Sequence, residues 1–206
     1  MEEKIRNLTF IVVLGFIITF ILIIGLYFRG GTSSTSNNNN NNNSSGSSSS
    51  NSTYDVSKMD EVDTDEALAL FEEEGTHVLY LGRSTCSICV SFVPVLNEVQ
   101  EDLGFTTNYL DVTAIADIWD SDKKDDADVQ ALSDKVKELT DKMSVETTVR
   151  TTMDGETVTL EDTIGNLFYE YGFTPITVII KDGEMVDGFV GYRDAETLTS
   201  LIEEHL

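Results

Sequence analysis

The chain has 206 residues and carries 37 acidic against 13 basic side chains, giving a formal net charge of -24. This balance excludes a nucleic-acid-binding role and argues against a domain that lies on anionic lipid. It is typical of a solvated acidic surface on an exported domain, and it would also attract basic substrates.

The first predicted element is the uncharged, almost wholly apolar run 8–28, which is long enough to cross a bilayer as a helix. A secretory signal peptide is the competing interpretation, but its apolar core is shorter and a small-residue cleavage site follows it. Here Arg29 follows, which favours a retained anchor. Lys4 and Arg6 precede the run, so we expect residues 1–7 in the cytoplasm and the remainder outside.

Residues 29–55 come next and consist mainly of Ser, Thr, Asn and Gly, with seven consecutive asparagines at 37–43. Such a segment cannot bury a core and is predicted to be a flexible tether. Its low-complexity part has a coil-like mean reach of about 25 Å. Residues 56–206 then form the predicted globular domain.

The two cysteines of the chain stand together in Cys86-Ser87-Ile88-Cys89, behind the apolar, strand-like run 77–81. At this spacing both thiols can lie at the start of a helix, where free amides and the helix dipole favour a thiolate. A thiolate is the reactive form, so the placement suits thiol–disulfide exchange. Inert buried thiols and half of a zinc site are the alternatives, although His77 and His205 are the only histidines.

The helix that begins at the cysteines is predicted to run to Leu103, because apolar residues recur at helical spacing and Gly104 follows as a stop. Pro94 falls inside this helix and should kink it. A strand is predicted at 107–112.

Residues 113–162 form an apparent insertion. They hold an amphipathic helix at 126–143 and a predicted hairpin of strands 145–151 and 156–160. The acidic run 120–126 lacks the spacing of a calcium-binding loop and is predicted to be a solvated loop. The insertion would serve as a subdomain that caps the core, or as a substrate-binding lid.

The C-terminal part begins with Thr174-Pro175, which opens the apolar, β-branched run 176–180. An Asp182-Gly183 turn links that run to a second strand at 185–190. Asp194 is the predicted N-cap of a last helix. The apolar face of this helix consists of Leu198, Leu201 and Ile202.

The order strand, Cys-x-x-Cys, helix with an internal proline, strand, helix, Thr-Pro, strand, Lys-Asp-Gly-Glu hairpin and final helix resembles the thioredoxin family. The resemblance covers residues 56–111 and 163–206. It implies an α/β thioredoxin-like fold with a central mixed sheet and helices on both faces. To that fold this chain would add the insertion and one preceding transmembrane helix.

The resemblance also implies roles for five residues. Cys86 would be the attacking thiol and Cys89 the resolving thiol. Pro175 would be the cis-proline, Thr174 would offer its backbone to a substrate, and Gly191 would let a substrate chain approach. An ordinary strand-entry proline at 175 and a plain turn glycine at 191 are the alternatives.

The chain departs from the thioredoxin pattern around the cysteines. Thr85 stands where thioredoxin has tryptophan, Tyr80 where it has a buried aspartate, and Thr107 where it has the lysine paired with that aspartate. The proton relay to Cys89 is therefore missing. The central Ser87-Ile88 carries no charge, so the redox poise is not assigned.

These observations predict a membrane-tethered, extracytoplasmic thiol–disulfide oxidoreductase that acts on cysteine-containing exported proteins and needs a separate redox partner. No dissociable cofactor, metal or nucleic acid is expected. The layout resembles membrane-anchored thioredoxin-like proteins, including bacteriocin transport accessory proteins. A non-catalytic thioredoxin-fold module in an export or assembly complex is the alternative.

Overall fold

The computed structural model describes residues 54–206. The predicted anchor at 8–28 and all but the end of the predicted tether at 29–55 lie outside the described residues. Between residues 54 and 206, no helix is both long enough and apolar enough to cross a membrane.

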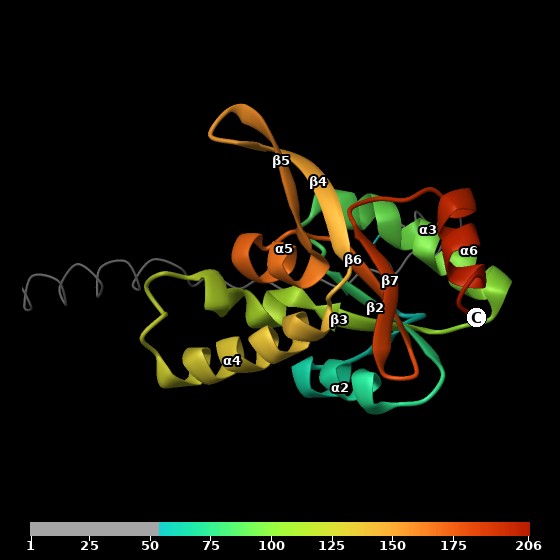
Figure 1. The fold of residues 1–206 in the computed structure, drawn as a ribbon, viewed down its shortest axis with the longest axis horizontal. Helices are drawn as coiled ribbons and strands as arrows, with labels where there is room; N and C mark the ends of the chain where they lie inside the picture. The colour runs from blue at the N-terminus through green and yellow to red at the C-terminus, as the bar shows by residue number, and fades with distance from the viewer. Residues whose placement is uncertain (1–53) are drawn as a thin grey trace, which may run out of the picture. The chain divides into compact units, whose positions relative to one another are not determined.

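The described part alternates strands and helices (Figure 1). The strands are β1 (Asp60–Glu61), β2 (Thr76–Gly82), β3 (Thr107–Asp111), β4 (Glu146–Met153), β5 (Glu156–Thr163), β6 (Ile176–Lys181) and β7 (Glu184–Val190). The α-helices are α2 (Thr64–Ala69), α3 (Ser87–Leu103), α4 (Ala127–Lys142), α5 (Ile164–Tyr171) and α6 (Ala195–Glu203), with 3₁₀ helices η1 (Leu70–Glu72) and η2 (Val112–Trp119).

Five strands form one mixed sheet in the order β1-β3-β2-β6-β7. The neighbours β1, β3 and β2 run parallel, whereas β6 is antiparallel to both β2 and β7. Parallel neighbours need a crossover, and α3 supplies the one between β2 and β3. This topology fits a thioredoxin-like fold and confirms the predicted central mixed sheet.

The sheet is covered on both faces because successive side chains of each strand point to opposite sides. On β2, Leu79 and Leu81 belong to the core shared with α2, α4, α5 and η2. Val78 and Tyr80 belong to the core shared with α3 and α6. Helices on both faces were predicted and are confirmed.

The helix that carries the cysteines begins at Ser87 and ends at Leu103, as its sequence spacing predicts. Gly104 follows in the left-handed conformation with φ of 76°, which a glycine adopts without steric cost. Pro94 lies inside the helix, as expected. The buried side of α3 faces the sheet with Phe92, Val93 and Leu96.

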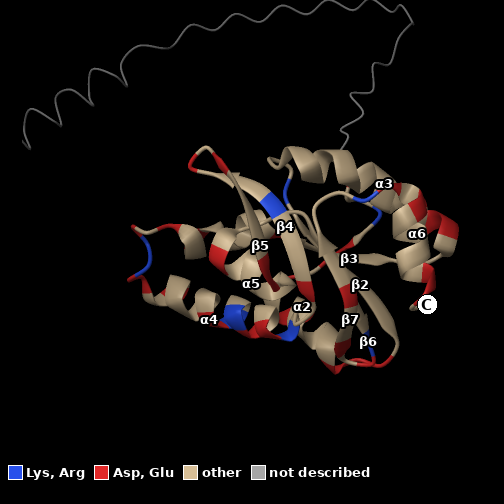
Figure 2. Cartoon of the chain, turned by 45° about the horizontal axis from the view of Figure 1, so that its top comes forward, with Lys and Arg blue, Asp and Glu red and all other residues tan. Residues whose placement is uncertain are grey.

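The apparent insertion adds η2, α4 and a separate two-stranded sheet of β4 and β5. Helix α4 matches the predicted range, and Val136, Leu139 and Met143 are fully buried against the sheet. The hairpin β4–β5 projects away from the five-stranded sheet in both views (Figures 1 and 2). The helical part of the insertion therefore belongs to the core of the domain.

Candidate active site

The two cysteines lie at the N-terminal end of α3, after β2 and a short turn. Cys86 is the N-cap residue, with an extended backbone at φ −89° and ψ 116°, and the helix starts at Ser87. The amide of Cys89, one turn inside, donates a hydrogen bond to the Cys86 Sγ at 3.3 Å. The predicted placement of both thiols at a helix start is confirmed, and Cys86 caps a free amide as a serine or aspartate would.

The two thiols differ in accessibility. Both are free, but Cys86 is partly exposed whereas Cys89 is fully buried, with 0 % of its surface accessible. A disulfide that arrives from solvent can therefore reach the Cys86 sulfur and not the Cys89 sulfur.

The Thr174-Pro175 step lies against this pair. Its peptide bond is cis, as predicted. The Cys86 thiol donates to the carbonyl oxygen of Thr174 at 3.6 Å, across 88 positions of sequence. Strand pairing explains the contact, since Ile176 in β6 is opposite Leu81 near the end of β2.

Gly191 follows β7 and lies beside the proline. Its amide donates to the Pro175 carbonyl oxygen at 2.8 Å, and its φ of 90° is one that side chains rarely adopt. A Cβ built on Gly191 would meet no atom within 4 Å, so the space around this glycine is open. The structure thus brings all five predicted site residues together, while their roles stay predictions.

The local hydrogen bonds favour the thiolate of Cys86. Partial burial acts to raise the pKa of Cys86, but four hydrogen bonds act in the opposite direction and the net effect lowers it. They come from the side chains of Cys89 and Thr174 and from the amides of Cys89 and Ile88. This is the state expected of an attacking cysteine at a helix N-terminus.

The surroundings of Cys89 have the opposite effect. Burial raises the pKa of Cys89 to about 11, and the hydrogen bond with Cys86 adds to the increase. The pair therefore combines an accessible sulfur that ionises readily with a buried sulfur that keeps its proton.

Large apolar side chains border the site. Ile88, between the cysteines, is 47 % exposed, and Tyr192, directly after Gly191, is 45 % exposed. Tyr171, 48 % exposed, packs against Phe173 with ring centroids 5.9 Å apart, just before Thr174. Sequence reasoning missed this apolar border, although its residues lie within three positions of the predicted site residues.

The residues at the two relay positions are also buried. Tyr80 and Thr107 are both 0 % exposed, and neither hydroxyl makes a hydrogen bond. The two residues are not opposite each other in the sheet, because Tyr80 is paired with Tyr109 and Thr107 with Val78. The Thr107 amide donates to the Gln100 side chain, near the end of α3 that is distant from the cysteines, so Tyr80 alone of the two is a candidate to act on them.

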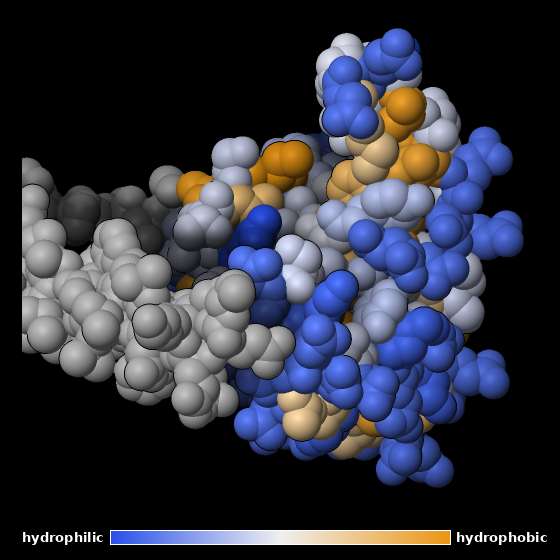
Figure 3. Space-filling model, turned by 90° about the vertical axis from the view of Figure 1, so that its left-hand side faces the viewer, coloured by the Kyte–Doolittle hydropathy of each residue, from blue (hydrophilic) through white to orange (hydrophobic). Residues whose placement is uncertain are grey.

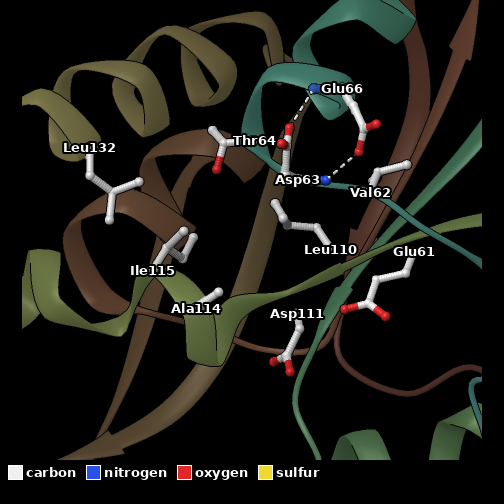
Figure 4. Close-up of a pocket in the computed structure, with 10 residues that line it drawn as sticks. All are labelled: Glu61, Val62, Asp63, Thr64, Glu66, Leu110, Asp111, Ala114, Ile115 and Leu132. Atoms are coloured by element: carbon white, nitrogen blue, oxygen red, sulfur yellow. Dashed lines mark hydrogen bonds between the residues drawn. The ribbon is translucent and has the colours of Figure 1, made fainter.

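The described residues hold no cluster of three or more histidine, cysteine or acidic side chains that could bind a metal ion. A cavity of about 410 Å³ lies between α2, β3, η2 and α4 (Figure 4). Its lining combines apolar side chains with carboxylates, of which Asp63 and Glu66 form the capping box of α2. None of the five predicted site residues lines this cavity.

Comparisons with known proteins found similarity to solved structures but none to a family model or a curated sequence. No family model matches the sequence, and no curated protein matches it. Among solved structures, thioredoxin from Plasmodium falciparum matches 72 % of this chain and 100 % of its own, at 17 % identity and a TM-score of 0.40. A mutant thioredoxin from Halobacterium salinarum matches 71 % of this chain and 90 % of its own, at 17 % identity and a TM-score of 0.38.

The class of the protein follows from its own topology. The strand order, the cysteine pair at the start of α3 and the cis-proline before β6 together fit a thioredoxin-like fold. A fold of this class with two nearby free thiols is suited to thiol–disulfide chemistry.

Proposed function

We propose that this protein is a membrane-tethered, extracytoplasmic thiol–disulfide oxidoreductase that acts on cysteines of exported proteins. One observation carries the proposal. The partly exposed Cys86 caps α3 and accepts a hydrogen bond from the Cys89 amide beside the Thr174 carbonyl, whereas Cys89 is fully buried. Burial raises the pKa of Cys89 to about 11. This asymmetry supports Cys86 as the attacking thiol and Cys89 as the resolving thiol.

The reaction proceeds through a mixed disulfide. The Cys86 thiolate attacks one sulfur of a substrate disulfide, and the other substrate sulfur leaves as a thiolate that takes up a proton. Cys89 then loses its proton and attacks the Cys86 sulfur, which releases the second substrate thiolate and closes the Cys86–Cys89 disulfide. The same steps in reverse oxidise a substrate dithiol, so the direction depends on the redox partner.

The substrate is an extended polypeptide with apolar residues near its cysteine. The exposed Ile88, Tyr171 and Tyr192 offer apolar contacts, and the backbone around Thr174 offers a strand edge. Acidic residues are spread over the described elements and basic residues are few (Figure 2), which favours basic substrate segments. One side of the domain also gathers apolar residues above a hydrophilic lower part (Figure 3).

The location forms part of the same proposal. Residues 8–28 anchor the chain, residues 1–7 stay in the cytoplasm, and the segment 29–55 tethers the domain outside. The layout is that of membrane-anchored accessory proteins, including those of bacteriocin transport. A thiol reagent that cannot cross membranes should label Cys86 in intact cells, and labelling only after lysis would refute this orientation.

Insulin reduction in the presence of a dithiol tests the activity with the full chain in detergent. We expect the wild-type protein to accelerate precipitation of the insulin chains and Cys86→Ser to abolish the acceleration. Cys89→Ser should instead accumulate mixed disulfides with substrates in cells, because the resolving thiol is absent.

A wild-type protein without turnover and without trapped partners would support the alternative, a binding module in an export or assembly complex. Trapping by Cys86→Ser but not by Cys89→Ser would reverse the assigned roles of the cysteines.

A further inference from the structure

Resolution of the mixed disulfide requires a Cys89 thiolate, which the cysteine pair alone does not stabilise. Cys89 must become a thiolate, yet it is fully buried and burial raises its pKa to about 11. After burial, the largest effects on the pKa of Cys89 come from the Cys86 thiol, the Arg83 backbone and the Thr174 side chain. None of these is a carboxylate or an imidazole. A further inference, which rests on the proposed function, concerns the group that stabilises this thiolate.

The side chain of Tyr80 reaches the end of β2, from which the chain turns into the cysteine motif. A Cβ on Gly82 would lie 2.4 Å from the Tyr80 hydroxyl oxygen, so the hydroxyl occupies the space that a side chain at 82 would fill. The ring is held between Tyr109, stacked at 5.7 Å, and Phe92, at 6.0 Å between centroids. Phe92 lies one turn beyond Cys89 on the same helix.

The Tyr80 hydroxyl is buried without a partner at hydrogen-bond geometry, and its ring belongs to the core that packs against the cysteine helix α3. Burial is the largest cause of the raised pKa of Tyr80, and the Cys89 sulfur is the next. The Tyr54 hydroxyl also acts on the Tyr80 hydroxyl, and neither contact meets hydrogen-bond geometry. The Tyr80 hydroxyl therefore has no well-formed hydrogen bond while Cys89 keeps its proton.

The neighbouring hydroxyls are arranged differently. The Tyr109 hydroxyl donates to the Gly82 carbonyl at 3.4 Å and accepts from the Tyr54 hydroxyl at 3.0 Å. Tyr109 therefore already has partners, whereas a buried hydroxyl without a partner is a rarity that calls for an explanation. Tyr80 and Tyr109 thus form a natural test and control pair.

We propose that the Tyr80 hydroxyl donates a hydrogen bond to the Cys89 thiolate and so stabilises it during resolution of the mixed disulfide. Cys89 gives its proton to solvent, and the sulfur lone pair forms the bond to Cys86. The electrons of the Cys86–substrate bond leave with the substrate sulfur, which takes up a proton. Tyr80 keeps its own proton throughout, and in the reverse reaction it stabilises Cys89 as the leaving thiolate.

A single-turnover experiment on the full chain in detergent separates the two steps. An aromatic disulfide that releases a coloured thiolate reacts first with Cys86 and releases one equivalent. Attack by Cys89 on the resulting mixed disulfide releases the second equivalent. Because the chain has only two cysteines, the two phases report the two thiols separately.

We expect Tyr80→Phe to slow the second phase by about tenfold or more at pH 7, the effect of losing a hydrogen bond to a charged group. Its pH profile should also move to higher pH, since the thiolate has lost its donor. The rate of the first phase should stay within about twofold of the wild-type rate. Tyr109→Phe removes a neighbouring hydroxyl. It should leave the rate of the second phase within about threefold of the wild-type rate and should not shift its pH profile.

Equal second phases in Tyr80→Phe and wild type would overturn the proposal, and so would slowing of both phases without a shift of the pH profile. Failure of Tyr80→Phe to fold would also overturn it, because an unpartnered hydroxyl should be dispensable for stability. If the wild-type protein itself lacks a second phase, the proposed oxidoreductase function fails, whatever Tyr80 does.

Discussion

The two faces of the five-stranded sheet are built from different side chains. Under α2, α4, α5 and η2 the core is largely aliphatic, and Phe71 and Phe168 are the aromatic side chains among its buried residues. Under α3 and α6 the core contains Tyr80, Phe92, Tyr109 and Phe189. We call these the aliphatic face and the aromatic face.

The aromatic face also contains buried hydroxyl groups that have no partner at hydrogen-bond geometry. Tyr80 is opposite Thr177 across the β2–β6 pair, and Val78 is opposite Thr107 across the β2–β3 pair. The hydroxyls of Tyr80, Thr107 and Thr177 are all buried without a partner, and all three residues lie in strand positions that face α3 and α6. Each costs on the order of 1–3 kcal/mol.

A fold tolerates such a cost mainly where function requires it. The aliphatic face therefore supplies stability, and the aromatic face, which packs against the helix that carries the cysteines, gives up some stability. The predictions below test this division, beginning with the largest expected effect.

Deleting one large ring from each face should have equal effects on stability and unequal effects on chemistry. Phe92 and Phe168 are both fully buried, so alanine at either position should lower the free energy of unfolding by about 3–5 kcal/mol. Only Phe92→Ala should change the rate of Cys86 alkylation in the native state, since Phe92 lies on the helix of the cysteines and against Tyr80. Denaturant titration and alkylation kinetics measure the two effects.

The division between faces would be wrong if Phe168→Ala altered native-state alkylation as much as Phe92→Ala does. Both rates are best compared well below the unfolding transition, so that unfolded molecules do not contribute.

A glycine in the aliphatic face tests whether the insertion is an integral part of the core. A Cβ on Gly165 would lie 1.9 Å from the backbone oxygen of Thr140, so Gly165→Ala must push α5 away from α4. We expect a loss of about 1–3 kcal/mol from overpacking. Gly104→Ala is the control, because it meets no atom within 4 Å and suffers only from its positive φ, about 1 kcal/mol. A smaller loss at Gly165 than at Gly104 would mean that α4 adapts freely.

Local chemistry explains which parts of the fold the sequence could predict. Both hairpins turn at an Asp-Gly pair, and Asp154 and Asp182 adopt the positive φ values of 51° and 52° that such turns require. The helix after Cys86 was predictable from its apolar spacing and from Gly104. Each of these elements is specified within a few residues of itself.

Elements that depend on distant partners were not predicted. Strand β1 is Asp60–Glu61, two acidic residues with no strand propensity, and it exists only because it pairs with Asn108 and Tyr109. The 3₁₀ helices η1 and η2 were missed. Helix α2 was missed too, although its capping box of Asp63 and Glu66 is a local signal that could have revealed it. Likewise, the position of the Tyr80 hydroxyl depends on the empty space at Gly82 and on the helix packed above, which no local pattern reveals.

The aromatic face should also make the protein sensitive to alkali. Burial raises the pKa of Cys89 from its ordinary value near 9 to about 11, so the native state holds this proton more tightly than the unfolded chain. The associated stability is complete below pH 9 and is lost as the pH rises through about 11. We expect a loss of about 1–2 kcal/mol over this interval, less than the full shift would give, and a smaller loss in Cys89→Ala. Denaturant titrations at several pH values measure this loss. If the free energy of unfolding falls equally with pH in wild type and in Cys89→Ala, the loss does not come from Cys89.

The smallest expected effect lies on the aliphatic face, at the start of α5. The Thr163 side chain accepts a hydrogen bond from the Asn166 amide at 3.1 Å and so caps the helix. Thr163→Ala should lower the free energy of unfolding by about 1 kcal/mol, whereas Thr163→Ser, which keeps the hydroxyl, should recover most of the loss. Neither variant should change the alkylation rate of Cys86 or the resolving step, since this cap stabilises a helix on the other side of the sheet. A clear change in thiol kinetics with intact folding would show that the two faces are coupled, and the separation of stability from chemistry would then have to be abandoned.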